Sequence, residues 1–119
     1  MHIISRLDQK KIHKKDYNAN KMEMTEIIGP LTTEKEAMIS LREVTVMPGG
    51  QVPKHKHSFE EIYYLMYGII EMTVGDDTVQ IRRFDSVIVP PNTEHSIKNN
   101  SDTDAVYLII GKFEKELNE

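Results

Sequence analysis

The sequence contains no cysteine and no long apolar run. Without cysteine the chain can form no disulfide, offers no thiolate ligand to a metal and has no cysteine nucleophile. This composition is compatible with a reducing compartment. The apolar runs are far shorter than the roughly 18 residues of a membrane-spanning helix. The N-terminal residues lack the order of a signal peptide. We therefore expect a cytoplasmic protein without membrane contacts.

The chain also lacks an excess of basic residues. It carries 15 lysines and arginines against 19 aspartates and glutamates, which gives a formal net charge of -4. A negative chain has no general attraction to a polyanion. One basic cluster has aspartates beside it and is typical of a solvated arm: Lys10, Lys11, Lys14 and Lys15, with Asp8 and Asp16. The sequence therefore predicts no nucleic-acid partner.

Most of the chain alternates between short segments typical of β-strands and residues typical of turns. A chain of 119 residues with 39% hydrophobic and 29% charged residues is typical of one globular domain. We expect the segment 39–47 to be a strand that ends at Pro48-Gly49-Gly50. Further β-type segments cover 62–67, 69–74, 79–83, 86–89, 95–98 and 105–112. Because no convincing helix of ten residues is present, the pattern predicts an all-β sandwich or barrel.

Three histidines and one glutamate form the candidate site. His55 and His57 are two residues apart, so an extended backbone would point both imidazoles to the same face. His95 lies on another predicted strand, and Glu61 follows His57 by four residues. Imidazole nitrogen and carboxylate oxygen are ligands for Fe, Mn, Ni, Co or Zn. The neighbouring Glu60 is a rival for Glu61, but strand alternation points the two to opposite faces.

The spacing of these residues resembles the cupin family. The first cupin motif, G-x5-H-x-H-x3-E-x6-G, is matched at each fixed position from Gly49 to Gly68. The second motif, G-x5-P-x-G-x2-H-x3-N, is matched at Pro90, His95 and Asn99. Two residues depart from it, because Phe84 and Asn92 stand where the family has glycine. Asparagine tolerates a left-handed backbone, whereas with Phe84 the sequence does not determine the local turn before Asp85.

The resemblance implies a single-domain jelly-roll barrel with a divalent transition metal held by His55, His57, Glu61 and His95. We expect 1–21 to be an N-terminal strand and polar arm that packs on the barrel or a partner. The barrel would cover 22–113, and 114–119 would be a charged tail. The segment 62–67 is apolar on both faces, and with the resemblance this favours a homodimer.

Two classes of function remain open for such a site. The first is an enzyme acting on a small oxygenated molecule, such as an organic acid, sugar or phenolic, with dioxygenase-like, isomerase or lyase chemistry. Tyr63 is the candidate acid of such an enzyme, or a hydrogen-bond donor to a bound anion, although a strand aromatic is more often a packing residue. The second is a binding or sensing protein without turnover. In either case we expect metal occupancy to fall as the pH drops through the histidine range near about 6.

Overall fold

The computed structural model describes residues 3–12, 20–33 and 37–112 of the chain. In this part of the protein a 3-10 turn precedes nine strands in a single sheet. The elements are η1 (Arg6–Asp8), β1 (Lys10–Ile12), β2 (Asn20–Ile28), β3 (Ile39–His55), β4 (Glu61–Tyr67), β5 (Ile69–Val74), β6 (Asp77–Arg82), β7 (Ser86–Val89), β8 (His95–Lys98) and β9 (Ala105–Lys112). None of the described residues belongs to a helix long and apolar enough to cross a bilayer.

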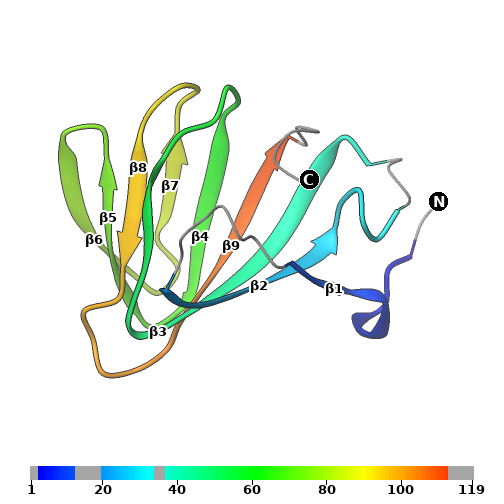
Figure 1. Ribbon diagram of the computed structural model, residues 1–119, viewed down its shortest axis with the longest axis horizontal. Coiled ribbons are helices and arrows are strands. Elements are labelled where there is room, and N and C mark those ends of the chain that lie inside the picture. Colours follow the sequence, from blue (N-terminus) through cyan, green and yellow to red (C-terminus); the bar gives the residue numbers. More distant parts are fainter. Residues whose placement is uncertain (1–2, 13–19, 34–36, 113–119) are drawn as a thin grey trace.

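The sheet is antiparallel and rolls up, so that segments far apart in sequence lie side by side (Figure 1). Its strand order is β6-β5-β8-β3-β9-β4-β7, and β2 pairs with β3 outside this path, with β1 beyond it. The nonconsecutive neighbours are those of a jelly roll, and the expected all-β barrel is confirmed.

Strand β3 turns the corner of the barrel. Its first part, from Ile39 to Val46, pairs with β9, and its last part, from Gln51 to His55, pairs with β8. The predicted end of this strand at Pro48-Gly49-Gly50 is therefore wrong. Gly49 adopts φ +79°, which bends the backbone, while its N–H still donates to the Asn99 carbonyl at 2.9 Å. The bend preserves the hydrogen bonding that a break would lose.

The N-terminal segment also differs from the expected strand. Ser5 and the residues after it form a 3-10 turn, because the Asp8 carboxylate accepts hydrogen bonds from Ser5 N and Oγ. The short strand β1 lies instead within the predicted polar arm and pairs with β2. Residues 20 and 21 of the arm belong to β2, while residues 13–19 and the charged tail lie outside the described residues. The same holds for His2 and His13, two histidines that match no ligand pattern. The proposed domain boundaries stay a prediction.

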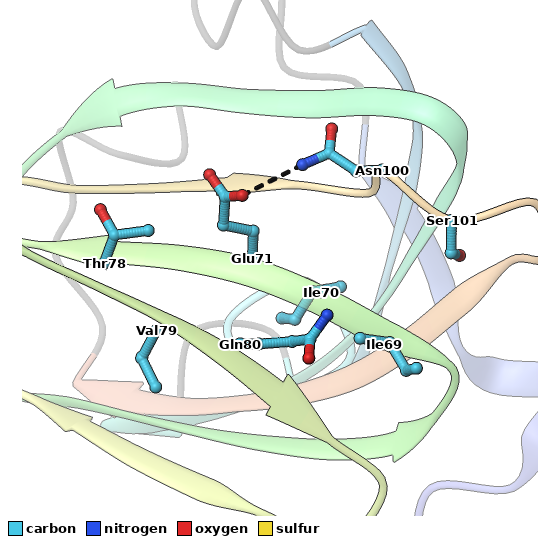
Figure 2. Close-up of a pocket in the computed structure, with 8 residues that line it drawn as sticks. All are labelled: Ile69, Ile70, Glu71, Thr78, Val79, Gln80, Asn100 and Ser101. Carbon is cyan, nitrogen blue, oxygen red and sulfur yellow. Dashed lines mark hydrogen bonds between the residues drawn. The ribbon is translucent and has the colours of Figure 1, made fainter.

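Grooves formed by described residues lie on the outer surface of the barrel, and two of them are well defined. A groove of about 220 Å³ crosses β5 and β6 beside the turn before β9, where Asn100 Nδ2 donates to Glu71 Oε2 at 3.1 Å (Figure 2). A second groove of about 460 Å³ is lined mainly by apolar side chains from β3, β4 and β9, and Ile62 and Ile110 are among them. Neither groove includes one of the three candidate histidines.

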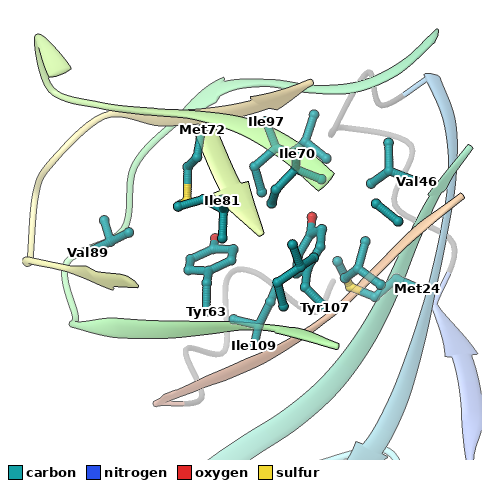
Figure 3. Packing of buried hydrophobic residues seen from close by; sticks show 14 residues of the cluster. Met24, Val46, Tyr63, Ile70, Met72, Ile81, Val89, Ile97, Tyr107 and Ile109 are labelled. Atoms are coloured by element: carbon teal, nitrogen blue, oxygen red, sulfur yellow. The ribbon is translucent and has the colours of Figure 1, made fainter. Parts of the chain in front are cut away.

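Apolar side chains fill the inside of the barrel. Figure 3 shows residues from both ends of the sheet meeting there, with Tyr63 and Tyr107 beside Ile70 and Ile81. In β4 the alternation is as expected: Tyr63 and Leu65 point inward with Glu61. Each fully buried aliphatic or aromatic side chain contributes roughly 1.5 to 3 kcal/mol to folding. The core therefore stabilises the barrel, and through Tyr63 it reaches the candidate histidines.

Candidate metal centre

Two neighbouring strands bring the three histidines together. His55 is the last residue of β3 and His95 the first of β8, and the two are directly paired in the sheet. His57 follows β3 by two residues. One ring nitrogen from each of the three histidines lies within 4.8 Å of the others. The ring centroids of His55 and His95 are 4.2 Å apart, and those of His55 and His57 are 5.0 Å apart.

Backbone carbonyls fix the tautomers of two of these rings. His55 Nδ1 lies 2.8 Å from the Pro53 carbonyl oxygen, and His95 Nδ1 lies 2.9 Å from the Thr93 carbonyl oxygen. A carbonyl oxygen can only accept, so each Nδ1 carries the proton and each Nε2 of a neutral ring keeps its lone pair. Metal-binding histidines are commonly oriented by such a second hydrogen bond. His95 Nε2 is buried and makes no hydrogen bond to any described residue.

His57 is held by its backbone and by an aromatic neighbour. Its ring stacks on Phe59, with centroids 5.1 Å apart and planes 9° from parallel. The His57 carbonyl accepts the Asn92 N–H at 2.6 Å. Asn92 has φ +58°, so the left-handed backbone expected at this position is present without glycine. The loops on either side of the site are therefore fastened to each other.

Glu61 lies beside the histidines. Its Oε1 is 3.2 Å from His95 Nε2 and 3.7 Å from His57 Nε2. The side chain is buried at the start of β4, whereas Glu60 is exposed. Gly111 pairs with Glu61 across β9, and a Cβ at Gly111 would lie 3.3 Å from Glu61 Cγ. Glycine at this position therefore lets the glutamate pack directly against the strand.

Tyr63 points its hydroxyl at Glu61. The Tyr63 hydroxyl donates to Glu61 Oε1 at 2.9 Å, and the tyrosine ring meets the His95 ring edge-on at 5.8 Å between centroids. The same carboxylate oxygen therefore faces the tyrosine and two histidines. This contact positions Glu61. A role for Tyr63 as an acid, or as a hydrogen-bond donor to an anionic substrate, stays a prediction.

Burial sets the protonation states of the site. Desolvation lowers the pKa of His57 to about 4, and it also lowers the pKa of His55, partly opposed by the Pro53 hydrogen bond. Burial raises the pKa of Glu61, but the side-chain contact with His95, the electrostatic interaction with His57 and the Tyr63 hydrogen bond together hold it below its usual value. The site therefore has neutral His55 and His57 and an ionised carboxylate at neutral pH.

This donor set fits a transition metal. Neutral imidazoles with free Nε2 lone pairs and one carboxylate suit borderline ions such as Fe, Mn, Co, Ni and Zn, whereas Ca and Mg prefer oxygen ligands. The buried Nε2 of His95 faces Glu61 Oε1 at 3.2 Å, and with the proton on Nδ1 both atoms offer lone pairs, which a cation would satisfy. The chain has no cysteine and therefore no thiolate ligand, so a site for a metal that prefers sulfur is disfavoured.

Some contacts of the site had no signal in the sequence. The sequence indicated the three histidines and Glu61, which the structure brings together. It gave no indication that Phe59 stacks on His57, or that Tyr63 bonds to Glu61. The carbonyls of Pro53 and Thr93 each lie two residues before the histidine they orient. A carbonyl is present at every residue, so only the backbone geometry selects these two.

Phe84 shows how the second departure from the motif is accommodated. It adopts φ +73°, a left-handed conformation that glycine would take without strain. Its N–H donates to the Leu65 carbonyl at 2.7 Å, and its ring stacks on Tyr64 at 6.4 Å between centroids. The turn before Asp85 therefore forms with phenylalanine in place of glycine.

Solved structures with the same fold include a polyketide cyclase, RemF from Streptomyces resistomycificus. It aligns with a TM-score of 0.81 and 21% sequence identity over 96% of this chain and 80% of that chain. At this identity the similarity shows the fold alone.

Two curated proteins are similar in sequence. An uncharacterised protein of Methanocaldococcus jannaschii is 38% identical over 61 residues, which is 50% of this chain and 49% of the relative. H2HPP isomerase of Bacillus subtilis is 33% identical over 66 residues, which is 55% of this chain and 28% of the relative. This chain thus spans less than half the length of either curated relative it matches.

A family model covers most of the barrel and all four candidate ligands. The model describes a cupin domain, and it matches residues 42–111, which is more than half of the chain. The matched range begins in β3 and ends in β9, so it contains both strands that carry the histidine pair and the strand that carries Glu61. The chain therefore belongs to the cupin family.

Proposed function

We propose that this cupin binds one divalent transition metal through His55, His57 and His95, with Glu61 as fourth ligand, and acts on a small oxygenated molecule. The observation that carries the proposal is the buried Nε2 of His95. Its ring is locked by the Thr93 carbonyl and faces a carboxylate and two further imidazoles. Such a group of donors lies close enough together to converge on one cation.

The bound ion would supply Lewis acidity toward a carbonyl or enolate oxygen, or a site for dioxygen chemistry. The chain's own residues supply the rest. Two backbone carbonyls keep the histidine lone pairs directed inward, and Tyr63 holds the carboxylate. The apolar core, which includes Tyr63, packs against the site through the His95 ring.

One relative that is similar in sequence supports an enzyme over a purely structural protein. It is named an isomerase, and that name describes the conversion of an organic molecule. The fold also carries other activities, so the reaction must be determined from the site itself. The alternative is a binding or sensing protein in which the metal anchors a small effector that remains unchanged.

A turnover experiment separates the two. Protein purified anaerobically and loaded with Fe(II) or Mn(II) is incubated under air with a panel of small organic acids, sugars and phenolics. The enzyme proposal predicts that at least one compound is converted, and that Glu61→Gln slows the conversion while the exposed Glu60→Gln does not. Binding of a compound that is recovered unchanged would support the sensing alternative.

We also propose that the protein forms a homodimer through the outer face of the sheet. One row of apolar side chains crosses five paired strands on this face: Ile88, Ile62, Ile110, Leu41 and Ile28. Ile88 is 61% exposed and Ile62 is 38% exposed. Such a row is typical of an interaction surface. Sedimentation should give a dimer for the parent and a monomer for Ile62→Glu, with Val79→Glu on β6 as control. A monomeric parent would contradict it.

A further inference from the structure

An arginine lies inside the barrel near the histidines. Arg42 is on the inward face of β3, where Ser40 and Val44 on either side of it are also buried, and it is only 8% exposed. A buried guanidinium is stable only where anionic or strongly polar groups surround it. The burial of this positive charge in the barrel that holds the candidate metal site therefore requires a chemical explanation.

The register of the sheet places Arg42 close to that site. Arg42 pairs with Ile109, and Ile109 pairs with Tyr63, so the three form one inward row. The next row runs from Ser40 through Gly111 to Glu61. Two strand spacings, about 10 Å, separate the Cα atoms of Arg42 and Tyr63.

Glu26 is the acidic neighbour of Arg42 in the barrel. It pairs with Arg42 across β2 and β3 and is 0% exposed. Its Oε2 accepts the Thr32 N–H at 2.8 Å, so this carboxylate also fastens the turn after β2. A divalent cation and Arg42 would bring three positive charges into the barrel, against one negative charge each from Glu26 and Glu61. Counted over these groups of the described residues alone, and with uncharged imidazoles, the cation and Arg42 exceed the two carboxylates by one positive charge, which favours an anion.

We propose that Arg42 is the specificity-determining residue of this cupin and binds a carboxylate of the substrate. This selects small oxygenated acids over neutral sugars and phenols. The proposal rests on the metal site of the proposed function. A guanidinium presents five N–H donors in a planar fork that matches a carboxylate. Charge-assisted pairs of this kind are stronger than neutral hydrogen bonds, and a neutral substrate would forgo them.

The test compares two probes of similar size, pyruvate and hydroxyacetone, of which only the first carries a carboxylate. Each is titrated into Co(II)-loaded protein, and binding is followed by the absorption spectrum of the metal. Arg42→Met should weaken pyruvate binding about 10- to 100-fold and leave hydroxyacetone binding unchanged. Arg82→Met, at an exposed arginine on β6, is the matched control and should bind pyruvate like the parent.

A second variant and a second measurement cover the cases in which the first variant does not fold or the protein takes up no metal. If Arg42→Met does not fold, the double variant Arg42→Met with Glu26→Gln removes both buried charges and takes its place. Metal content is measured on the same samples, so a parent that takes up no metal refutes the proposed function separately. In that case the melting temperature of metal-free protein decides: pyruvate should raise it in the parent and not in the variant. Equal pyruvate binding or equal stabilisation in parent and variant would overturn the role of Arg42.

Discussion

The hydroxyl of Tyr63 donates a 2.9 Å hydrogen bond to Glu61 Oε1, the oxygen that also faces His95 and His57. Tyr63 and Glu61 are two residues apart on β4, so strand alternation places both side chains inside the barrel. The hydrogen bond restrains the carboxylate and stabilises its ionised form. Such an outer hydrogen bond to a ligand contributes to metal affinity without itself contacting the metal.

Tyr63→Phe should therefore weaken metal binding while leaving the fold intact. The substitution removes only the hydroxyl from a buried ring, so we expect an affinity about 10-fold lower for Co(II) or Zn(II), measured by competition with a chelator. Tyr64→Phe is the control, because Tyr64 points to the outer face of the same strand. An unchanged affinity in Tyr63→Phe would show that the hydroxyl does not hold the ligand.

Metal-free protein should lose stability as the pH falls. The pKa of His57 is about 4 in the folded protein and about 6.5 in the unfolded chain, so between these values the unfolded chain binds more protons. The lowered pKa of Glu61 acts in the same direction at lower pH, where the folded carboxylate resists protonation. Urea unfolding from pH about 7 to about 4 should show a declining free energy of unfolding. The decline should be smaller in His57→Phe, and an equal decline in both proteins would refute this cause.

Metal occupancy should persist to lower pH than the sequence alone suggests. An ordinary histidine site loses its ligands near pH about 6. Burial keeps His55 and His57 neutral below that value, so protons compete less well with the cation. Metal content after dialysis at pH about 5 should remain close to its value at pH about 7. Loss of half the metal already at pH about 6.5 would indicate exposed histidines with ordinary pKa values.

Asn99 should be among the most sensitive positions for stability. Its side chain is 0% exposed, and Nδ2 donates to the carbonyls of Val46 and Thr103 while Oδ1 accepts from Ser101 N and Oγ. Asn99→Ala leaves these groups without partners, and we expect a loss of roughly 3 kcal/mol in the free energy of unfolding. Asn100→Ala, with one exposed hydrogen bond, is the control and should change stability by about 0.5 kcal/mol or less. Similar values for both would contradict this assignment.

Phe84 offers a test of backbone strain. A side chain in the left-handed region costs about 1 to 2 kcal/mol, which glycine avoids. Alanine would keep that strain and lose the contacts with Tyr64 and Arg83. Phe84→Gly should therefore be more stable than Phe84→Ala by about 1 kcal/mol in urea unfolding. The reverse order would mean that the turn is not left-handed.

Part of this structure could be predicted from local sequence patterns. The histidine spacing, the alternation in β4 and the exposure of Glu60 follow from the two-residue period of a strand. The path of β3 could not be predicted in the same way, because a Pro-Gly-Gly run ordinarily ends a strand. Here the pairing continues because Asn99, about fifty positions away, receives the Gly49 N–H and donates to the Gly50 carbonyl.

The same limit applies to the site. Sequence spacing predicts the candidate metal ligands, but the positions of Tyr63, Phe59 and Arg42 relative to them depend on sheet register and barrel closure. Arg42 stands in a segment that reads as an ordinary amphipathic strand. Only the alternation of buried residues in the folded sheet places its charge inside the barrel.

The most direct test of the central claim is the metal content of protein purified without oxygen and without chelators. The parent protein and Glu60→Gln should each hold one divalent transition metal per chain. His57→Ala should hold almost none, with only a modest change in melting temperature, because the apolar core does not include the ion. A parent protein that takes up no transition metal, or a His57→Ala variant that binds it as the parent does, would contradict the proposed site.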